Sequence, residues 1–264
     1  MSPGVIVEVG GIPILLRPDD SSVHEAITQR FAGFLTDKPS SDPFELTMRL
    51  EPGGPTGAQE PRVVCGEDRW RFERGDFQAE WSPRSGRGWV RCKLASAPTV
   101  DSVVRILHSL LLARQGGFLL HSGSVIRNGR AFIFAGVSGA GKTTITRLAP
   151  PDVTLLTDEI SYIRPGDAGY LAYGTPFAGD LGIPGTNVSA PVKALYVLSK
   201  GPRNIIEPLR NLEAATVLLR NILFFAEEPE LVRSVFETAC RFADRVPIYR
   251  LTFAPTPQVW ELFK

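Results

Sequence analysis

The stretch HSGSVIRNGRAFIFAGVSGAGKTT, residues 121–144, decides the fold that we expect for this chain of 264 residues. Asn128-Gly129 is the strongest two-residue signal for a β-hairpin, and it separates the apolar runs FLLHSGSVIR and RAFIFAG. The second run ends at a glycine-rich turn, and TTITRLA after that turn can open a helix. The sequence therefore predicts a hairpin, a glycine loop and a helix in direct succession.

Residues 136–143, GVSGAGKT, match the phosphate-loop pattern G-x-x-x-x-G-K-[ST]. Glycines let successive backbone N–H groups curl around phosphate oxygens, and the start of the helix directs its positive end at the anion. Lys142 can reach the β- and γ-phosphates, and the Thr143 hydroxyl can bind magnesium. We therefore expect ATP and Mg²⁺ as cofactors. The residues expected to bind them are Gly136, Val137, Ser138, Gly139, Ala140, Gly141, Lys142, Thr143 and Thr144.

Two acids, Asp158 and Glu159, end the next apolar run, VTLLTDE. A carboxylate at that point of a nucleotide-binding α/β protein holds the magnesium shell or activates the nucleophile, so we expect Thr143, Asp158 and Glu159 to be metal ligands. Adjacent strand residues point to opposite faces, so the spacing does not separate the two roles. The alternative is a solvated acid pair at the entry to a loop.

Two further features stand beside the loop in the sequence. His121 lies on the strand before the hairpin, where it is either a structural histidine or a neighbour of Asp158 that is tuned by it. The run Gly174–Phe177, followed by Gly179-Asp180, is either a simple turn or an ordered loop over the triphosphate or its acceptor.

The remainder of the chain predicts an α/β protein with a strand-rich beginning. Short strands fill the first hundred residues or so, with one helix over Val23–Leu35 and a Gly/Pro-rich loop over Glu51–Glu60. A helix capped by Thr99, with Asp101 in its first turn, ends before Gly116-Gly117. Further elements are expected as helices over Leu212–Phe225, Glu230–Ala243 and Gln258–Lys264, and as a strand over IYRLTFA. We place a β-rich region at residues 1–98 and a second domain at residues 99–264.

Composition excludes several classes of protein. The formal net charge is +1, which argues against a nucleic-acid binder that depends on bulk charge. The local cluster Arg84, Arg87, Arg91 and Lys93 is interpreted as solvated strand and turn positions. The three cysteines lack metal or redox spacing, the N-terminus lacks a signal-peptide pattern, and no apolar run is long enough for a bilayer. We expect a cytoplasmic protein without a membrane or nucleic-acid partner.

The layout HSGSVIRNGRAFIFAGVSGAGKTT followed by LLTDE resembles the kinase domain of the HPr kinase/phosphorylase-like (HprK-related) serine kinase family, of which the chain would be a short, divergent member. The resemblance is good over Gly117–Pro165 and implies a P-loop kinase of the HPr kinase/phosphoenolpyruvate carboxykinase type. In that fold the loop lies on a mixed, largely antiparallel sheet with flanking helices. The resemblance also implies catalytic roles for Lys142, for Asp158 as the acceptor of the hydroxyl proton, and for His121 as its helper.

The resemblance implies a kinase that transfers the γ-phosphate of ATP to a serine of a small protein or precursor peptide. Asp-Glu replaces the usual Asp-Asp pair, and the later E-I-R-G signature has no clear match, so neither phosphorylase activity nor HPr as substrate is expected. Short relatives also occur beside peptide-maturation genes, including lasso-peptide clusters. Members of the family often form oligomers, so a homo-oligomer is considered. Residues 1–98 either bind the acceptor or cover the core. Two alternatives stay open: a small-molecule kinase, and a nucleotide-binding regulatory module with slow hydrolysis.

Overall fold

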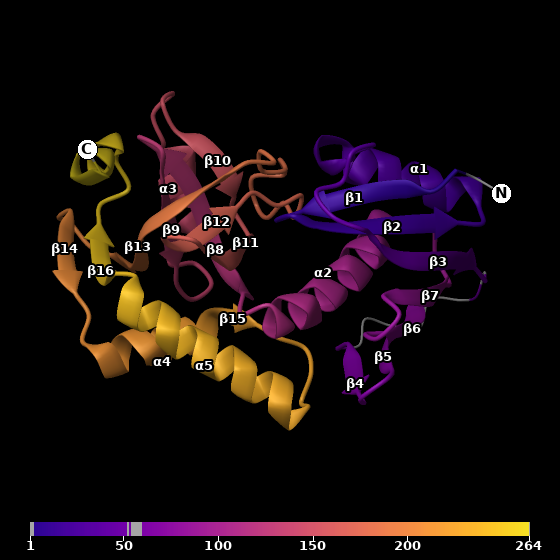
Figure 1. Cartoon of the computed structure of the whole chain (residues 1–264). Coiled ribbons are helices and arrows are strands. Elements are labelled where there is room, and N and C mark those ends of the chain that lie inside the picture. Colours follow the sequence, from indigo (N-terminus) through magenta and orange to yellow (C-terminus); the bar gives the residue numbers. More distant parts are fainter. Residues whose placement is uncertain (1–2, 52, 54–59, 264) are drawn as a thin grey trace. The chain divides into compact units, whose positions relative to one another are not determined.

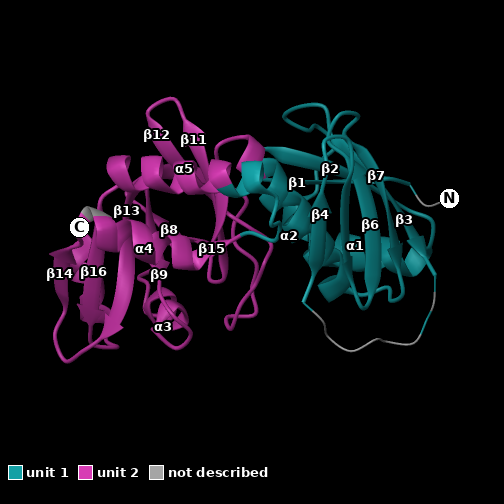
Figure 2. Ribbon diagram, turned by 90° about the horizontal axis from the view of Figure 1, so that it is seen from below, with its two compact units in different colours: residues 1–111, 224–232 teal, residues 112–223, 233–264 magenta. Residues whose placement is uncertain are grey.

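The computed structural model of the chain describes residues 3–51, 53 and 60–263, which form two compact units (Figure 1). Unit 1 comprises residues 1–111 and 224–232, and unit 2 comprises residues 112–223 and 233–264, coloured teal and magenta in Figure 2. The division falls inside the helix expected after Thr99 rather than at its start. Most of the loop predicted at Glu51–Glu60 lies outside the described residues.

Unit 1 is built on one mixed sheet, and within its described residues the strand order is β1-β2-β3-β7-β6-β5-β4. The pairs β2–β3 and β3–β7 are parallel, and the others are antiparallel. The short strands predicted in this region are confirmed, and the structure adds β4 to the runs that the sequence indicates. They are β1 (Val5–Val9), β2 (Ile12–Pro18), β3 (Phe44–Leu50), β4 (Arg62–Cys65), β5 (Trp70–Arg74), β6 (Phe77–Ser82) and β7 (Arg87–Cys92).

The helices of unit 1 differ from the prediction at their ends. Helix α1 covers Ser21–Arg30 and is followed by the short 3₁₀ turn η1 (Ala32–Phe34), so the predicted helix over Val23–Leu35 is too long. Helix α2 covers Ala97–Arg114, and Thr99 is not its N-cap: the Thr99 amide instead donates to the hydroxyl of Ser96 at 3.4 Å.

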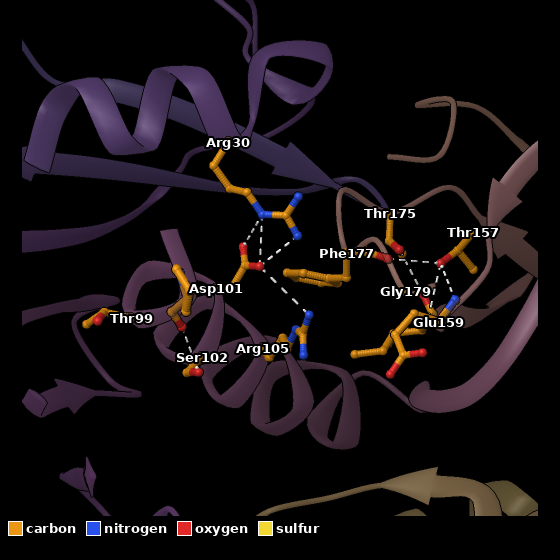
Figure 3. Close-up of polar contacts among 12 residues, drawn as sticks. Arg30, Thr99, Asp101, Ser102, Arg105, Thr157, Glu159, Thr175, Phe177 and Gly179 are labelled. Atoms are coloured by element: carbon orange, nitrogen blue, oxygen red, sulfur yellow. Dashed lines mark hydrogen bonds and ion pairs between the residues drawn. The ribbon is translucent and has the colours of Figure 1, made fainter. Parts of the chain in front are cut away.

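Asp101 was expected to complement the positive first turn of its helix, but the structure gives it a different partner. The guanidinium of Arg30 in α1 donates to both carboxylate oxygens of Asp101, with its Nη2 at 2.7 Å from Oδ2 (Figure 3). Arg105, one turn further along α2, lies 3.8 Å from the same carboxylate. The acid therefore joins α1 to α2 inside unit 1.

Unit 2 contains a mixed sheet whose described strands follow the order β10-β8-β11-β12-β13-β16-β14, with β9 and β15 attached to it. Strand β9 pairs with β8 antiparallel and with β13 parallel, and β13 pairs with β16 parallel. The strands are β8 (Phe118–Arg127), β9 (Arg130–Ala135), β10 (Thr154–Thr157), β11 (Ile160–Gly166), β12 (Gly169–Tyr173), β13 (Ser189–Lys200), β14 (Ile205–Pro208), β15 (Ile222–Leu223) and β16 (Ile248–Phe253).

The sheet of unit 2 is buried on both faces. Along β9, Ile133 and Ala135 join one apolar cluster, whereas Phe132 and Phe134 join the other. Helices α4 (Asn211–Asn221) and α5 (Pro229–Arg245) supply residues to the first cluster. Helix α3 (Lys142–Arg147) and the C-terminal 3₁₀ helix η2 (Pro257–Phe263) supply the second. Strand β9 is therefore held rigidly just before the glycine loop.

One predicted helix of unit 2 ends earlier in the structure, and another is a 3₁₀ helix. The pattern over Leu212–Phe225 predicted helix throughout, but the helix ends at Asn221 and Ile222–Leu223 pair with β8 as β15. The short terminal helix predicted over Gln258–Lys264 is present as the 3₁₀ helix η2, which covers Pro257–Phe263. Within the described residues, no helix combines the length and the apolar character that crossing a bilayer requires.

Candidate functional site

The predicted hairpin is confirmed and delivers the chain to the glycine loop. Asn128 and Gly129 have φ of 51° and 70°, the left-handed conformations of a tight two-residue turn, and Arg127 pairs with Arg130 across it. Strand β9 then ends at Ala135, and the loop follows immediately. The tight turn at Asn128-Gly129 therefore determines the residue at which β9 ends and the glycine loop begins.

The loop between β9 and α3 adopts a conformation that depends on its glycines. Gly136, Gly139 and Gly141 have φ of 155°, 76° and 110°, values that residues with a side chain rarely adopt. A Cβ on Gly141 would also lie 2.8 Å from the ring of Phe253. The tip of the loop is exposed: Val137 retains 79% of its accessible surface.

Lys142 follows the glycine loop as the first residue of α3. Its side chain is buried, and its Nζ donates to the carbonyl of Gly136 at 3.0 Å. Burial lowers the pKa of Lys142, and the charges of Glu159 and Asp180 act in the opposite direction. The loop therefore holds an ammonium group close to two carboxylates.

The predicted acid pair lies in a bend and not at the end of a continuous strand. Strand β10 ends at Thr157 and β11 begins at Ile160, and both strands pair with β8. The Thr157 hydroxyl accepts the amides of Glu159 and Ile160 at 3.1 and 3.2 Å, and lies 3.4 Å from the carbonyl of Phe177 (Figure 3). Because Asp158 and Glu159 lie in a bend, their side chains do not have to point to opposite faces as they would along a regular strand. Each side chain contacts a different set of groups.

Asp158 is almost fully buried, with 2% of its surface exposed. Its Oδ1 accepts the amide of Gly179 and its Oδ2 accepts the amide of Leu181, both at 2.8 Å. Asp158 therefore anchors the segment 174–188 between β12 and β13. The sequence indicates, for residues 174–180 of this segment, either a simple turn or an ordered loop over the triphosphate or its acceptor. The hydrogen bonds to Asp158 show that these residues form an ordered loop.

The segment 174–188 lies along β10 through backbone hydrogen bonds. The amides of Thr175 and Thr186 donate to the carbonyls of Leu156 and Leu155 at 3.0 and 2.9 Å. At Gly185 the approach is so close that a Cβ would lie 1.6 Å from the Leu156 carbonyl oxygen. This packing brings Asp180 next to the glycine loop.

Asp180 is a site residue that the sequence analysis missed. The Thr143 hydroxyl, at the start of α3, lies 3.4 Å from Oδ2 of Asp180. Gly179-Asp180 was noted only as part of a loop, because the two partners are far apart in sequence and nothing local indicates their contact. The one local feature that could have pointed to Asp180 as a site residue is its position directly after Gly179.

His121 contacts Glu159 rather than Asp158. Its Nδ1 lies 3.5 Å from Oε1 of Glu159, and both side chains are about one-third exposed. Burial lowers the pKa of His121, the nearby charge of Lys142 lowers it further, and Glu159 raises it. His121 therefore favours the neutral form, in which one ring nitrogen can accept a proton.

A magnesium ion would find few protein ligands at this site. In residues 3–51, 53 and 60–263, no group of three or more His, Cys, Asp or Glu side chains is arranged to hold a metal. Mg²⁺ commonly takes only one or two carboxylates from the protein, and phosphates and waters complete its shell. The hydroxyl of Thr143 beside the Asp180 carboxylate fits that kind of ligand set.

The fold and the site together define a mixed α/β protein with two sheets, in which a buried lysine next to a glycine loop lies within electrostatic reach of a histidine and two acids. The sequence model of a family described as "SynChlorMet cassette protein ScmC" matches residues 93–264. The match covers more than half of the chain and the whole of the site, and the chain belongs to that family. No curated protein matches the chain.

Proposed function

We propose that the chain is an ATP- and magnesium-dependent kinase that transfers the γ-phosphate to a serine hydroxyl of a small protein or precursor peptide. The observation that carries the proposal is that three separate segments bring a histidine and two acids within electrostatic reach of Lys142 and Thr143. His121 comes from β8, Glu159 from the bend between β10 and β11, and Asp180 from the segment 174–188. Such a combination of one buried cation, acids and a neutral base suits phosphoryl transfer.

The glycine loop supplies the binding part of the mechanism. Its left-handed glycines let backbone N–H groups face an anion, and Lys142 adds a positive charge to the same place. Thr143 and Asp180 are the residues that would hold magnesium, which, when bound, would neutralise charge on the β- and γ-phosphates. Positioning and electrostatic stabilisation then provide most of the rate.

We assign Glu159 as the acceptor of the proton that the serine hydroxyl loses. Both oxygens of Asp158 already accept backbone amides, and that side chain is shielded from solvent. Glu159 is accessible and has His121 at 3.5 Å. In the proposed step the serine oxygen bonds to the γ-phosphorus while the bond to the β–γ bridging oxygen breaks. ADP leaves, and the serine proton passes to Glu159. Asp158 acts as a positioning residue, which differs from the role that the resemblance to HPr kinases implies.

The test is incubation of the full chain with Mg-ATP and a panel of serine-containing peptides and small proteins, read by intact mass and fragmentation. We expect at least one acceptor to gain one phosphoryl group on a serine, and Lys142→Ala to abolish the gain. ATP consumption stimulated by a metabolite, with every peptide and protein unmodified, would contradict the proposal in favour of a small-molecule kinase. Slow hydrolysis alone would contradict it in favour of a regulatory module.

A further inference from the structure

One face of the unit 1 sheet remains exposed and carries a set of arginines. Side chains alternate along each strand, so that Val90 and Cys92 of β7 point into the core while their neighbours point outward. We call the outward side the arginine face. It is defined by Arg49, Arg62, Arg71, Arg87, Trp89 and Arg91 on β3, β4, β5 and β7. Together with β6, which lies between β7 and β5, these strands are consecutive in the sheet (Figure 1).

The arginine face is hollowed into three shallow, open cavities that all meet at Trp89. The cavity over β4, β5 and β6 has a volume of about 480 Å³, and the one on the side of β3 has about 430 Å³. Each has room for a few side chains of a partner. Trp89 therefore lies at the centre of a continuous, contoured surface and not on a flat sheet.

The acids on this face do not balance its arginines. Glu80 lies 2.9 Å from Arg71 and 3.3 Å from the neighbouring Arg69, so two arginines share it. Arg87 and Arg91 lie 3.7 and 3.5 Å from Glu45 and Glu51. With these two acids and Asp68, Glu73 and Glu80 counted, five acids stand against the seven arginines that line the three cavities. Arg49 and Arg62 make no ion pair within the described residues. The face thus carries a surplus of positive charge, although the net charge of the whole chain is only +1.

Apolar surface lies between these charges. The guanidinium of Arg91 is 4.9 Å from the centre of the Trp89 ring, and Val64 at the rim is 53% exposed. The six positions that define the face include five arginines and no lysine. A planar guanidinium can hold a carboxylate through two parallel hydrogen bonds and can also stack on an aromatic ring. The pattern matches a partner with carboxylates next to apolar side chains.

We propose that the arginine face is the docking surface for an acidic peptide segment that carries an apolar residue over Trp89. The proposal rests on the proposed function in one respect, that the docked peptide belongs to the phosphoryl acceptor. A single-stranded nucleic acid is the less favoured occupant, because the face offers little aromatic surface on which bases could stack. Single-strand binders stack successive bases on several aromatic rings, whereas the described lining of the three cavities holds only Trp89 and Phe72, and Phe72 is 1% exposed.

The test is fluorescence anisotropy with a labelled synthetic peptide in which Asp and Glu alternate with Leu. Comparison probes are the same peptide with Lys in place of each acid, and a single-stranded oligonucleotide of similar length. We expect the full chain to bind the acidic peptide, with weaker binding at high salt. The double variant Arg49→Glu/Arg62→Glu and the single variant Trp89→Ala should each weaken binding about tenfold.

A matched charge change elsewhere provides the control. Arg220→Glu/Arg233→Glu alters two exposed arginines of α4 and α5 and should leave peptide binding unchanged. Thermal unfolding checks that each variant is folded. Absence of binding, equal binding by both double variants, or tighter binding of the oligonucleotide would each overturn the proposal. Lys142→Ala should bind the peptide like the wild type. If the wild type and Lys142→Ala bind the peptide, the variants of the arginine face bind it more weakly and no phosphoryl transfer occurs, the docking surface stands and the proposed function fails.

Discussion

At the scale of single residues, the fold gives two adjacent acids different surroundings. Asp158 points into the protein and accepts the amides of Gly179 and Leu181, whereas Glu159 remains accessible beside His121. The sequence could predict that an acid pair follows the glycine loop. It could not predict which acid is engaged, because the partners of Asp158 come from a segment whose position depends on the tertiary fold.

The two acids can be separated by amide substitutions. We expect Glu159→Gln to reduce the rate of phosphoryl transfer by about a hundredfold or more, because it removes the proton acceptor while it keeps the shape of the side chain. Asp158→Asn should lower the free energy of unfolding by about 1–3 kcal/mol, since one of its amide partners loses its acceptor, and should retain most of the rate at low temperature. Single-turnover kinetics and denaturant unfolding measure the two effects.

The control for these substitutions is Asp167→Asn, an exposed acid at the β11–β12 turn that should change neither rate nor stability. A large loss of rate in Asp158→Asn, with Glu159→Gln near wild type, would contradict the assignment. It would restore Asp158 as the proton acceptor.

The pKa of His121 depends on the charges of Lys142 and Glu159. We expect an NMR midpoint below the ordinary value of about 6.5, because burial and Lys142 both disfavour the charged ring. Lys142→Met should raise this midpoint, and Glu159→Gln should lower it, since one variant removes a positive neighbour and the other a negative one. The chain has three histidines, so the signal can be assigned by substitution. A midpoint that neither variant moves would contradict the geometry.

At the scale of elements, the segment 174–188 positions Asp180 through its packing on β10. Gly185→Ala should destabilise the chain by about 2–4 kcal/mol, because a Cβ there would overlap the Leu156 carbonyl oxygen. Gly33→Ala, where a Cβ meets no atom within 4 Å, should change stability by less than about 0.5 kcal/mol. Denaturant unfolding of both variants measures the difference. Equal stability of the two variants would show that the segment does not need this close approach.

The elements that could be predicted are those that depend on local chemistry. The β8–β9 hairpin follows from Asn128-Gly129, and the bend at the glycine loop follows from its own glycines. The missed features depend on distant partners. Ile222 and Leu223 continue a helical pattern, yet they pair with β8 as a strand. Ser96 rather than Thr99 caps α2, and Asp101 binds Arg30 from another helix.

At the scale of the whole molecule, the family match begins at residue 93 and includes all of the site, while most of unit 1 precedes it. If unit 2 carries the nucleotide site, Mg-ATP should slow amide exchange at residues 136–147, 157–160 and 174–188. Exchange in the strands β3 to β7 should stay unchanged. Hydrogen exchange read by mass spectrometry tests this expectation. Protection confined to unit 1 would contradict it.

Titration calorimetry of Mg-ATP tests the central claim, a triphosphate site at Gly136–Thr143, most directly. The full chain should bind Mg-ATP, and Lys142→Ala should weaken binding at least about tenfold, because the loop loses its buried ammonium group. Lys193→Ala, which removes an exposed lysine from β13, should bind like the wild type. No binding by the wild-type chain, or equal binding by Lys142→Ala and Lys193→Ala, would contradict the claim.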